Sequence, residues 1–122
     1  MTGSPLVLIL EDETMIAMMI EDELVDAGYD VAGPFSTCSG AFAWLSTNTP
    51  DLALLDTQLQ DGSCRDLAVE LRRRGIPFVV YSGAIDTDVT GLAGAPWVEK
   101  PALGKTLLDA LTQAITSSEQ TV

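Results

Sequence analysis

The 122-residue chain has 18 acidic and 6 basic residues, no histidine and a formal charge of −12, and 47% of its residues are hydrophobic. This length and apolar content predict a single domain with its own core. The charge disfavours direct binding to nucleic acid, which needs clustered Lys and Arg, and the absence of histidine excludes a His-dependent triad, a His general base and a His metal ligand.

The cysteines and the apolar runs narrow the class of protein further. Cys38 and Cys64 belong to no CxxC pattern, so we expect no zinc site. The apolar run 6–10 is too short for a signal peptide or a membrane span. We therefore expect a cytoplasmic protein with reduced thiols and no membrane or nucleic-acid partner. The basic cluster 72–74 falls at a predicted helix end, where it would complement the helix dipole.

Apolar runs predict five strands. In chain order they are PLVLIL (5–10), YDVAG (29–33), DLALLD (51–56), IPFVVYS (76–82) and PWVEKP (96–101).

Helical spacing of apolar residues predicts helices between these strands. The first helix ends at Gly28, the second is capped by Ser36 or Thr37, and the third ends at Gly75. The segment 57–63 is predicted to be a loop. The segment 83–95 is rich in Gly and Thr, which weakens a fourth helix. The last helix carries apolar residues at Leu103, Leu107, Leu111, Ala114 and Ile115.

Alternating strands and helices predict an α/β domain in which helices cover both faces of a parallel sheet. In such a doubly wound sheet, ligands bind beyond the carboxyl ends of the strands. Four of the predicted strands end on a charged or reactive group there. These groups are Glu11 and Asp12, then Asp56, Ser82 and Lys100.

Acidic groups gathered at one edge predict a cation site. Two carboxylates about 4 Å apart repel by roughly 4 kcal/mol at an effective dielectric constant near 20. Mg²⁺ relieves this repulsion and often bridges carboxylates to phosphate. Asp56 is then a candidate nucleophile, Lys100 could neutralise a phosphoryl oxygen, and Ser82 could donate a hydrogen bond to another.

The chain resembles the receiver domains of bacterial two-component response regulators, of the chemotaxis-regulator type. The resemblance covers nearly the full length and is carried by EDE after the first strand, LALLD ending at Asp56, YSG after the fourth strand and EKP around Lys100. It implies a three-layer, flavodoxin-like sheet with strand order 2-1-3-4-5. It also implies a single receiver domain over 1–122, without an output domain, that is not a classical enzyme.

The resemblance also implies a role for each site residue. Asp56 would accept a phosphoryl group from the phosphohistidine of a sensor kinase. Asp12, Asp56 and the backbone carbonyl of Gln58 would bind Mg²⁺, with Glu11 acting through a water molecule. Apart from the resemblance, we expect Glu13 only to start a helix, because acids favour the first turn.

The remaining expectations concern the switch and the partners. Lys100 would pair with the phosphoryl group, and the bond to Pro101 would be cis. Ser82 and Trp97 would move together on phosphorylation. The resulting change would alter binding to a downstream protein, or relay or sink phosphate, and the protein would be a monomer or weak dimer.

Three other functions remain open from the sequence. The first is an interaction module of the same fold that works without phosphorylation. The second is an FMN-binding protein, disfavoured because the loop after the first strand is acidic. The third is a haloacid-dehalogenase-type phosphatase, whose DxD motif should follow the first strand, whereas Asp56 follows the third.

Overall fold

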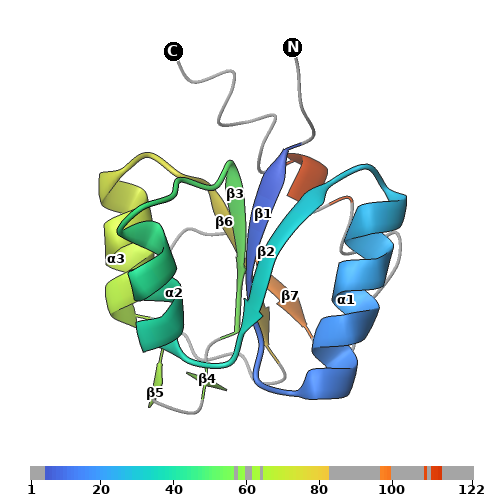
Figure 1. Cartoon of the computed structure of the whole chain (residues 1–122), viewed down its shortest axis with the longest axis horizontal. Helices are drawn as coiled ribbons and strands as arrows, with labels where there is room; N and C mark the ends of the chain where they lie inside the picture. Colours follow the sequence, from blue (N-terminus) through green and yellow to red (C-terminus); the bar gives the residue numbers. More distant parts are fainter. Residues whose placement is uncertain are drawn as a thin grey trace.

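Five parallel strands form the sheet at the centre of the protein (Figure 1). The structure, a computed structural model, describes residues 5–56, 58–59, 62–63, 65–82, 97–99, 109 and 111–113. The order of the strands is β2-β1-β3-β6-β7, which confirms the predicted order 2-1-3-4-5. The strands are β1 (Leu6–Leu10), β2 (Asp30–Phe35), β3 (Leu52–Leu55), β6 (Phe78–Ser82) and β7 (Trp97–Glu99).

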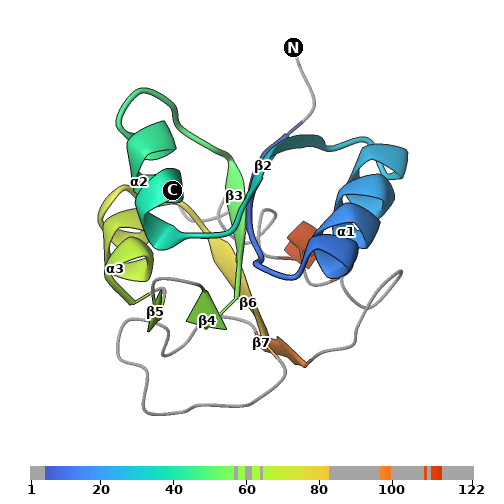
Figure 2. The ribbon, with the colours of Figure 1, turned by 60° about the horizontal axis from the view of Figure 1, so that its bottom comes forward.

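Helices cover both faces of this sheet. They are α1 (Thr14–Asp26), α2 (Cys38–Leu45) and α3 (Arg65–Arg73). Figure 1 shows α2 and α3 together on one side and α1 on the other, and the turned view in Figure 2 shows the same two layers. The helical residues 111–113 join the α1 layer, because Leu111 packs in the same apolar cluster as Ile20 and Leu24.

Strand β1 explains why both faces must be covered. Its side chains alternate, so that Leu8 and Leu10 pack in the cluster that includes α2 and α3, while Val7 and Ile9 pack in the cluster that includes α1. All four are at most 1% exposed. Full burial of such a side chain contributes about 1.5–3 kcal/mol, so this strand anchors the sheet from both sides.

The helix ends follow the predicted signals. Thr37 caps α2, because its Oγ1 accepts a hydrogen bond of 3.0 Å from the Gly40 N–H. Gly28 and Gly75 follow α1 and α3 with φ of 95° and 75°, in the left-handed region that glycine favours. Of the two candidate caps for α2, the structure therefore selects Thr37.

The prediction was wrong about the end of β2 and about the loop after β3. Strand β2 does not stop at Gly33 but runs through a cis Gly33–Pro34 bond to Phe35, because pairing with β1 resumes after a register shift. The predicted loop 57–63 contains a small antiparallel hairpin of β4 (Gln58–Leu59) and β5 (Gly62–Ser63). Figure 1 shows this hairpin near the carboxyl end of β3.

Some predictions fall outside the described residues. These are the cis bond before Pro101 and the weak fourth helix at 83–95. Across the part of the chain that the structure describes, no helix combines the length and the apolar character needed to cross a bilayer.

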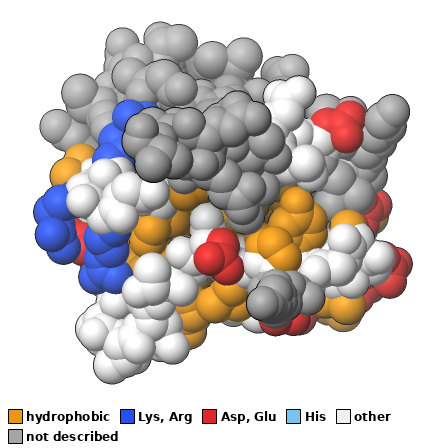
Figure 3. All heavy atoms as spheres, turned by 90° about the horizontal axis from the view of Figure 1, so that it is seen from above, with side chains coloured by type: hydrophobic (Ala, Val, Ile, Leu, Met, Phe, Trp, Pro, Cys, Tyr) orange, Lys and Arg blue, Asp and Glu red, His pale blue; other side chains and the backbone are white. Residues whose placement is uncertain are grey.

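The arginines at the end of α3 make specific contacts, beyond the predicted interaction with the helix dipole. Arg73 Nη2 and Arg74 Nε lie 2.7 Å and 2.5 Å from Glu70 Oε2. Arg74 also donates a 3.0 Å hydrogen bond to the Leu45 carbonyl, which joins α3 to the end of α2. The Arg72 guanidinium lies 5.2 Å from the centroid of the Phe78 ring. Figure 3 shows arginine side chains gathered on the α3 side of the molecule.

We predict that Glu70 makes stability depend on pH in the acid range. Hydrogen bonds from Arg73 and then Arg74 lower the pKa of Glu70 from 4.5 to about 2. The unfolded chain therefore binds a proton at Glu70 before the folded chain does, so the stabilisation is complete above pH 4.5 and is lost as the pH falls toward 2.

The measurement is urea unfolding of wild type and Glu70→Gln between pH 2 and 7. The variant should be less stable at neutral pH, and the difference should shrink on acidification and on addition of salt, because the pair is exposed. Asp22→Asn, which removes another exposed acid, is the control. If the free energies of unfolding of wild type and Glu70→Gln differ by the same amount at all pH values, the lowered pKa of Glu70 is not the source of the stabilisation.

Candidate functional site

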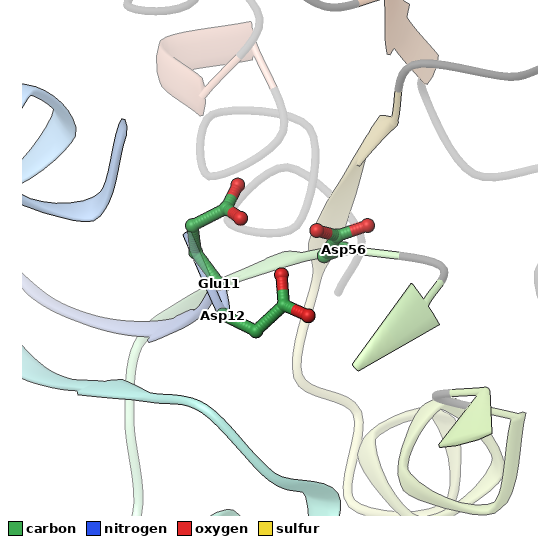
Figure 4. A group of neighbouring side chains, drawn as sticks. All are labelled: Glu11, Asp12 and Asp56. Atoms are coloured by element: carbon green, nitrogen blue, oxygen red, sulfur yellow. The ribbon is translucent and has the colours of Figure 1, made fainter. Parts of the chain in front are cut away.

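Three carboxylates meet at the carboxyl edge of the sheet. Glu11 and Asp12 follow β1, and Asp56 follows β3. Figure 4 shows the first two reaching from the end of β1 toward Asp56. One carboxylate oxygen from each lies within 4.8 Å of the others. Glu11 and Asp56 are only 3% and 6% exposed, whereas Asp12 is exposed to solvent.

Backbone hydrogen bonds hold the chain that carries these acids. On one side, the Asp56 N–H donates to the Leu10 carbonyl at 3.2 Å. On the other side, the Glu11 N–H donates to the Phe35 carbonyl at 3.0 Å. The end of β1 is thus fastened to both β3 and β2. The acids are therefore held close together by the sheet itself.

The three acids of the EDE motif have different environments. Glu11 also contacts its own chain, because its Oε2 accepts a 3.0 Å hydrogen bond from the Glu13 N–H. Glu13 lies immediately before α1 rather than in its first turn, and its side chain makes no capping hydrogen bond. Asp12 lies between them with its side chain exposed toward Asp56 (Figure 4).

This donor set fits a hard divalent cation. The ligands are carboxylate oxygens, which Mg²⁺ and Ca²⁺ prefer, and a site of three such oxygens carries negative charge that a cation would offset. Two oxygens bound to one Mg²⁺ at about 2.1 Å lie at most about 4.2 Å apart. Oxygens up to 4.8 Å apart can therefore bind one ion if the carboxylates move slightly closer together, or if a water molecule lies between one of them and the ion. The residues present therefore fit the predicted metal.

The other predicted site residues are placed only in part. Ser82 ends β6 and pairs with Glu99 of β7, and Trp97 opens β7 opposite Val80. Gln58 opens the hairpin strand β4. The side chains of Ser82 and Trp97, and the whole of Lys100, lie outside the described residues.

Sequence reasoning missed the contribution of β2 to the site. The Phe35 carbonyl accepts the hydrogen bond from Glu11, although the prediction ended this strand at Gly33. A Gly-Pro pair inside an apolar run was the available signal, since both residues in a strand commonly mark a bulge or a close backbone approach.

Comparison with known proteins supports the receiver prediction. A family model described as a response regulator receiver domain matches residues 7–112. Comparison with curated proteins gave no match.

Solved structures give the same picture. A CheY-like receiver domain protein from Methanospirillum hungatei JF-1 is 23% identical, with a TM-score of 0.88, and the match covers 98% of this chain and 100% of that one. The PhyR response regulator REC domain of Erythrobacter litoralis is 30% identical, with a TM-score of 0.82 and coverage of 93% and 92%. A sensor protein from Polaromonas sp. JS666 is 27% identical, with a TM-score of 0.81 and coverage of 93% and 98%.

We predict that removing the Asp56 charge stabilises the metal-free protein. Carboxylates 4–5 Å apart repel by roughly 3–4 kcal/mol at a dielectric constant near 20, so Asp56→Asn should raise the free energy of unfolding by about 1–3 kcal/mol. Saturating Mg²⁺ should stabilise wild type more than the variant and so reduce or reverse the difference.

Urea unfolding with EDTA and with MgCl₂ is the measurement. Asp26→Asn, at the exposed end of α1, serves as the control for a simple change in net charge. If both variants respond to Mg²⁺ as wild type does, the acidic cluster is not the metal site.

Proposed function

The chain belongs to the response regulator receiver family, and we propose on this premise that Asp56 accepts a phosphoryl group from the phosphohistidine of a sensor histidine kinase. The observation that carries the proposal is the position of Asp56. It follows a buried strand, is 6% exposed, and lies with Glu11 and Asp12 in a group whose oxygens are within 4.8 Å. A nucleophilic carboxylate in such a group can react at a cation-bound phosphate.

We assign the metal ligands from the same cluster. Asp12 and Asp56 would bind Mg²⁺ directly, with the backbone carbonyl of Gln58, and Glu11 would hold a bound water. Mg²⁺, when present, offsets the negative charge of the carboxylates and of the phosphoryl oxygens. Glu11 is buried and accepts a hydrogen bond from the Glu13 N–H. Both observations favour a role in holding the water rather than in reacting with phosphorus.

Phosphoryl transfer mainly requires that the Asp56 carboxylate and the phosphoryl group are held in the correct relative position. A carboxylate oxygen of Asp56 attacks phosphorus, and the bond between phosphorus and the imidazole nitrogen breaks. The imidazole nitrogen keeps the bonding electrons and takes a proton from solvent, and Asp56 becomes an acyl phosphate. In this proposal Lys100 neutralises a phosphoryl oxygen and Ser82 donates a hydrogen bond to another, a role that the place of Ser82 at the end of β6 supports.

The output in this proposal is a change in protein binding. Ser82 would move toward the phosphoryl group, and Trp97 would change position with it. Their strands β6 and β7 are paired at one side of the sheet, which supports a coupled movement of the two residues. The binding of a downstream protein, or of a further phosphotransfer protein, would then depend on the state of Asp56.

Phosphorylation at Asp56 is directly testable. Incubation with acetyl phosphate and Mg²⁺ should add one phosphoryl group, and the adduct should be labile to hydroxylamine, as acyl phosphates are. Intact-mass and peptide-mass measurements locate the adduct. Asp56→Asn should abolish it.

Asp51→Asn is a matched control, because Asp51 precedes the strand that Asp56 follows. Asn keeps an oxygen that can accept the 2.8 Å hydrogen bond from the Leu6 N–H. If wild type forms no adduct and no beryllofluoride complex while it binds Mg²⁺, the protein is an interaction module that works without phosphorylation.

The phosphodonor protein would need a surface beside the acids, and α1 offers one. Met15, Met18 and Met19 are 76%, 57% and 47% exposed. Their i, i+3 and i+4 spacing places them on one face of the helix, which starts two residues after Asp12. Exposed apolar side chains grouped in this way commonly mark a protein-binding surface, and methionine adapts to varied partners.

We predict that Met15→Ser together with Met18→Ser slows phosphotransfer from the kinase by about tenfold or more, as expected when two contact residues each contribute at least about 1 kcal/mol. Labelling by acetyl phosphate should not change, because that donor needs no docking surface.

Val69→Ser on α3 is the control, since Val69 is 52% exposed and lies on the other side of the sheet. Transfer rates are measured with the kinase that phosphotransfer profiling identifies. Equal rates for the methionine variant and the control would show that this face of α1 is not the docking surface.

A further inference from the structure

The pairing of β1 with β2 changes register just before the acids. Leu8 is opposite Ala32, but Leu10 is opposite Phe35. Strand β1 advances by two residues while β2 advances by three, so β2 carries one extra residue, which is a β-bulge. The bulge contains Gly33 and Pro34. The next residue, Phe35, supplies the carbonyl that accepts the hydrogen bond from the Glu11 N–H.

Pro34 explains why the regular ladder cannot continue. The Asp30 N–H donates to the Pro5 carbonyl at 2.9 Å. In a regular parallel pair the donors come from every second residue, so the next two would be Ala32 and Pro34. Pro34 has no N–H, and no donor would reach the Ile9 carbonyl in that register. The bulge instead brings Phe35 opposite Leu10.

Gly33 explains how the bulge can form. Its φ is 104°, in the region that side chains other than glycine rarely adopt. A Cβ at this position would lie 2.8 Å from the Ile9 carbonyl oxygen and 2.8 Å from the Phe35 nitrogen. Both are backbone atoms in paired strands, so neither can rotate aside. Any side chain here must push β1 and β2 apart or distort the bulge itself, at the point where the acids begin.

The affected backbone is the part that positions the site. The Glu11 N–H donates to the Phe35 carbonyl at 3.0 Å, and the Asp56 N–H donates to the Leu10 carbonyl at 3.2 Å. Moving Phe35 removes the β2 half of this support and leaves Glu11 and Asp12 held from β3 alone.

We propose that Gly33 is a positioning residue for the acidic site: the bulge that it permits places the Phe35 carbonyl against the Glu11 N–H and so holds Glu11 and Asp12 against Asp56. The metal-binding part of this inference rests on the proposed function. The geometric part concerns the metal-free protein.

The chain offers a matched control for the main variant. Gly28 has a φ of 95°, close to that of Gly33, but a Cβ there would meet nothing within 4 Å. Gly28→Ala therefore imposes the conformational cost without the clash and far from the acids. Gly33→Ala imposes both.

The experiment compares the two alanine variants with wild type. Both should be less stable than wild type in urea. Gly33→Ala alone should weaken Mg²⁺ binding, by about tenfold or more, the range expected when support around metal ligands is lost. It alone should also increase hydrogen exchange at the Glu11 amide without Mg²⁺. Equal Mg²⁺ affinity and equal Glu11 exchange in the two variants would overturn the proposal.

Two further measurements decide the matter if Gly33→Ala does not fold. Pro34→Ala keeps Gly33 but returns an N–H, so the regular register competes with the bulge, and we expect weaker Mg²⁺ binding than in Gly28→Ala. In wild type, the Glu11 amide should be strongly protected from exchange without Mg²⁺, and rapid exchange there would refute the inference. If wild type binds no Mg²⁺, the proposed metal chemistry fails, while amide exchange still tests the positioning role.

Discussion

Mutual repulsion among three carboxylates is tolerated in this protein because the backbone that carries them is hydrogen-bonded into a buried sheet. Glu11 and Asp12 continue β1, and Asp56 continues β3, so the backbone atoms that carry the charges can move apart only if the two strands separate. Separation would expose side chains such as Ile9 and Leu54, which are at most 1% exposed. The apolar core thus supplies the free energy that holds like charges together, and a cation or a phosphoryl group is attracted to the result.

The stabilising contacts and the reactive groups lie in different parts of the molecule. The apolar clusters fill both sides of the sheet, and the ion pairs of Glu70 with Arg73 and Arg74 belong to α3. The hydrogen bond from Arg74 to the Leu45 carbonyl ties α3 to α2 at their carboxyl ends. The acids therefore need contribute nothing to stability.

The sequence predicted that Glu11, Asp12 and Asp56 meet, because burial on both faces produces unbroken apolar runs and parallel strands share one carboxyl edge. The strand order was implied by the family resemblance, and the structure has that order. The family match confirmed the receiver resemblance.

The continuation of β2 past Gly33 was not predicted, since proline usually ends a strand and the register shift depends on where β1 lies. The hairpin of β4 and β5 was also missed, because two-residue strands leave no periodic pattern. The roles of Lys100, Ser82 and Trp97 stay predictions, because their side chains are not among the described residues.

The arginine cluster at the end of α3 has a consequence for how the molecule meets other charged surfaces. Helix α1 carries four acids and no base, whereas the segment 72–74 places three of the chain's 6 bases on the far side of the sheet. Among the described residues, α1 therefore presents only negative charge, whereas the end of α3 presents a cluster of positive charge. A positively charged surface attracts the acids of α1, which also carries the exposed methionines, and repels the arginines at the end of α3. Orientation before contact raises the fraction of collisions that are productive, and this advantage declines as salt shortens the range of the field.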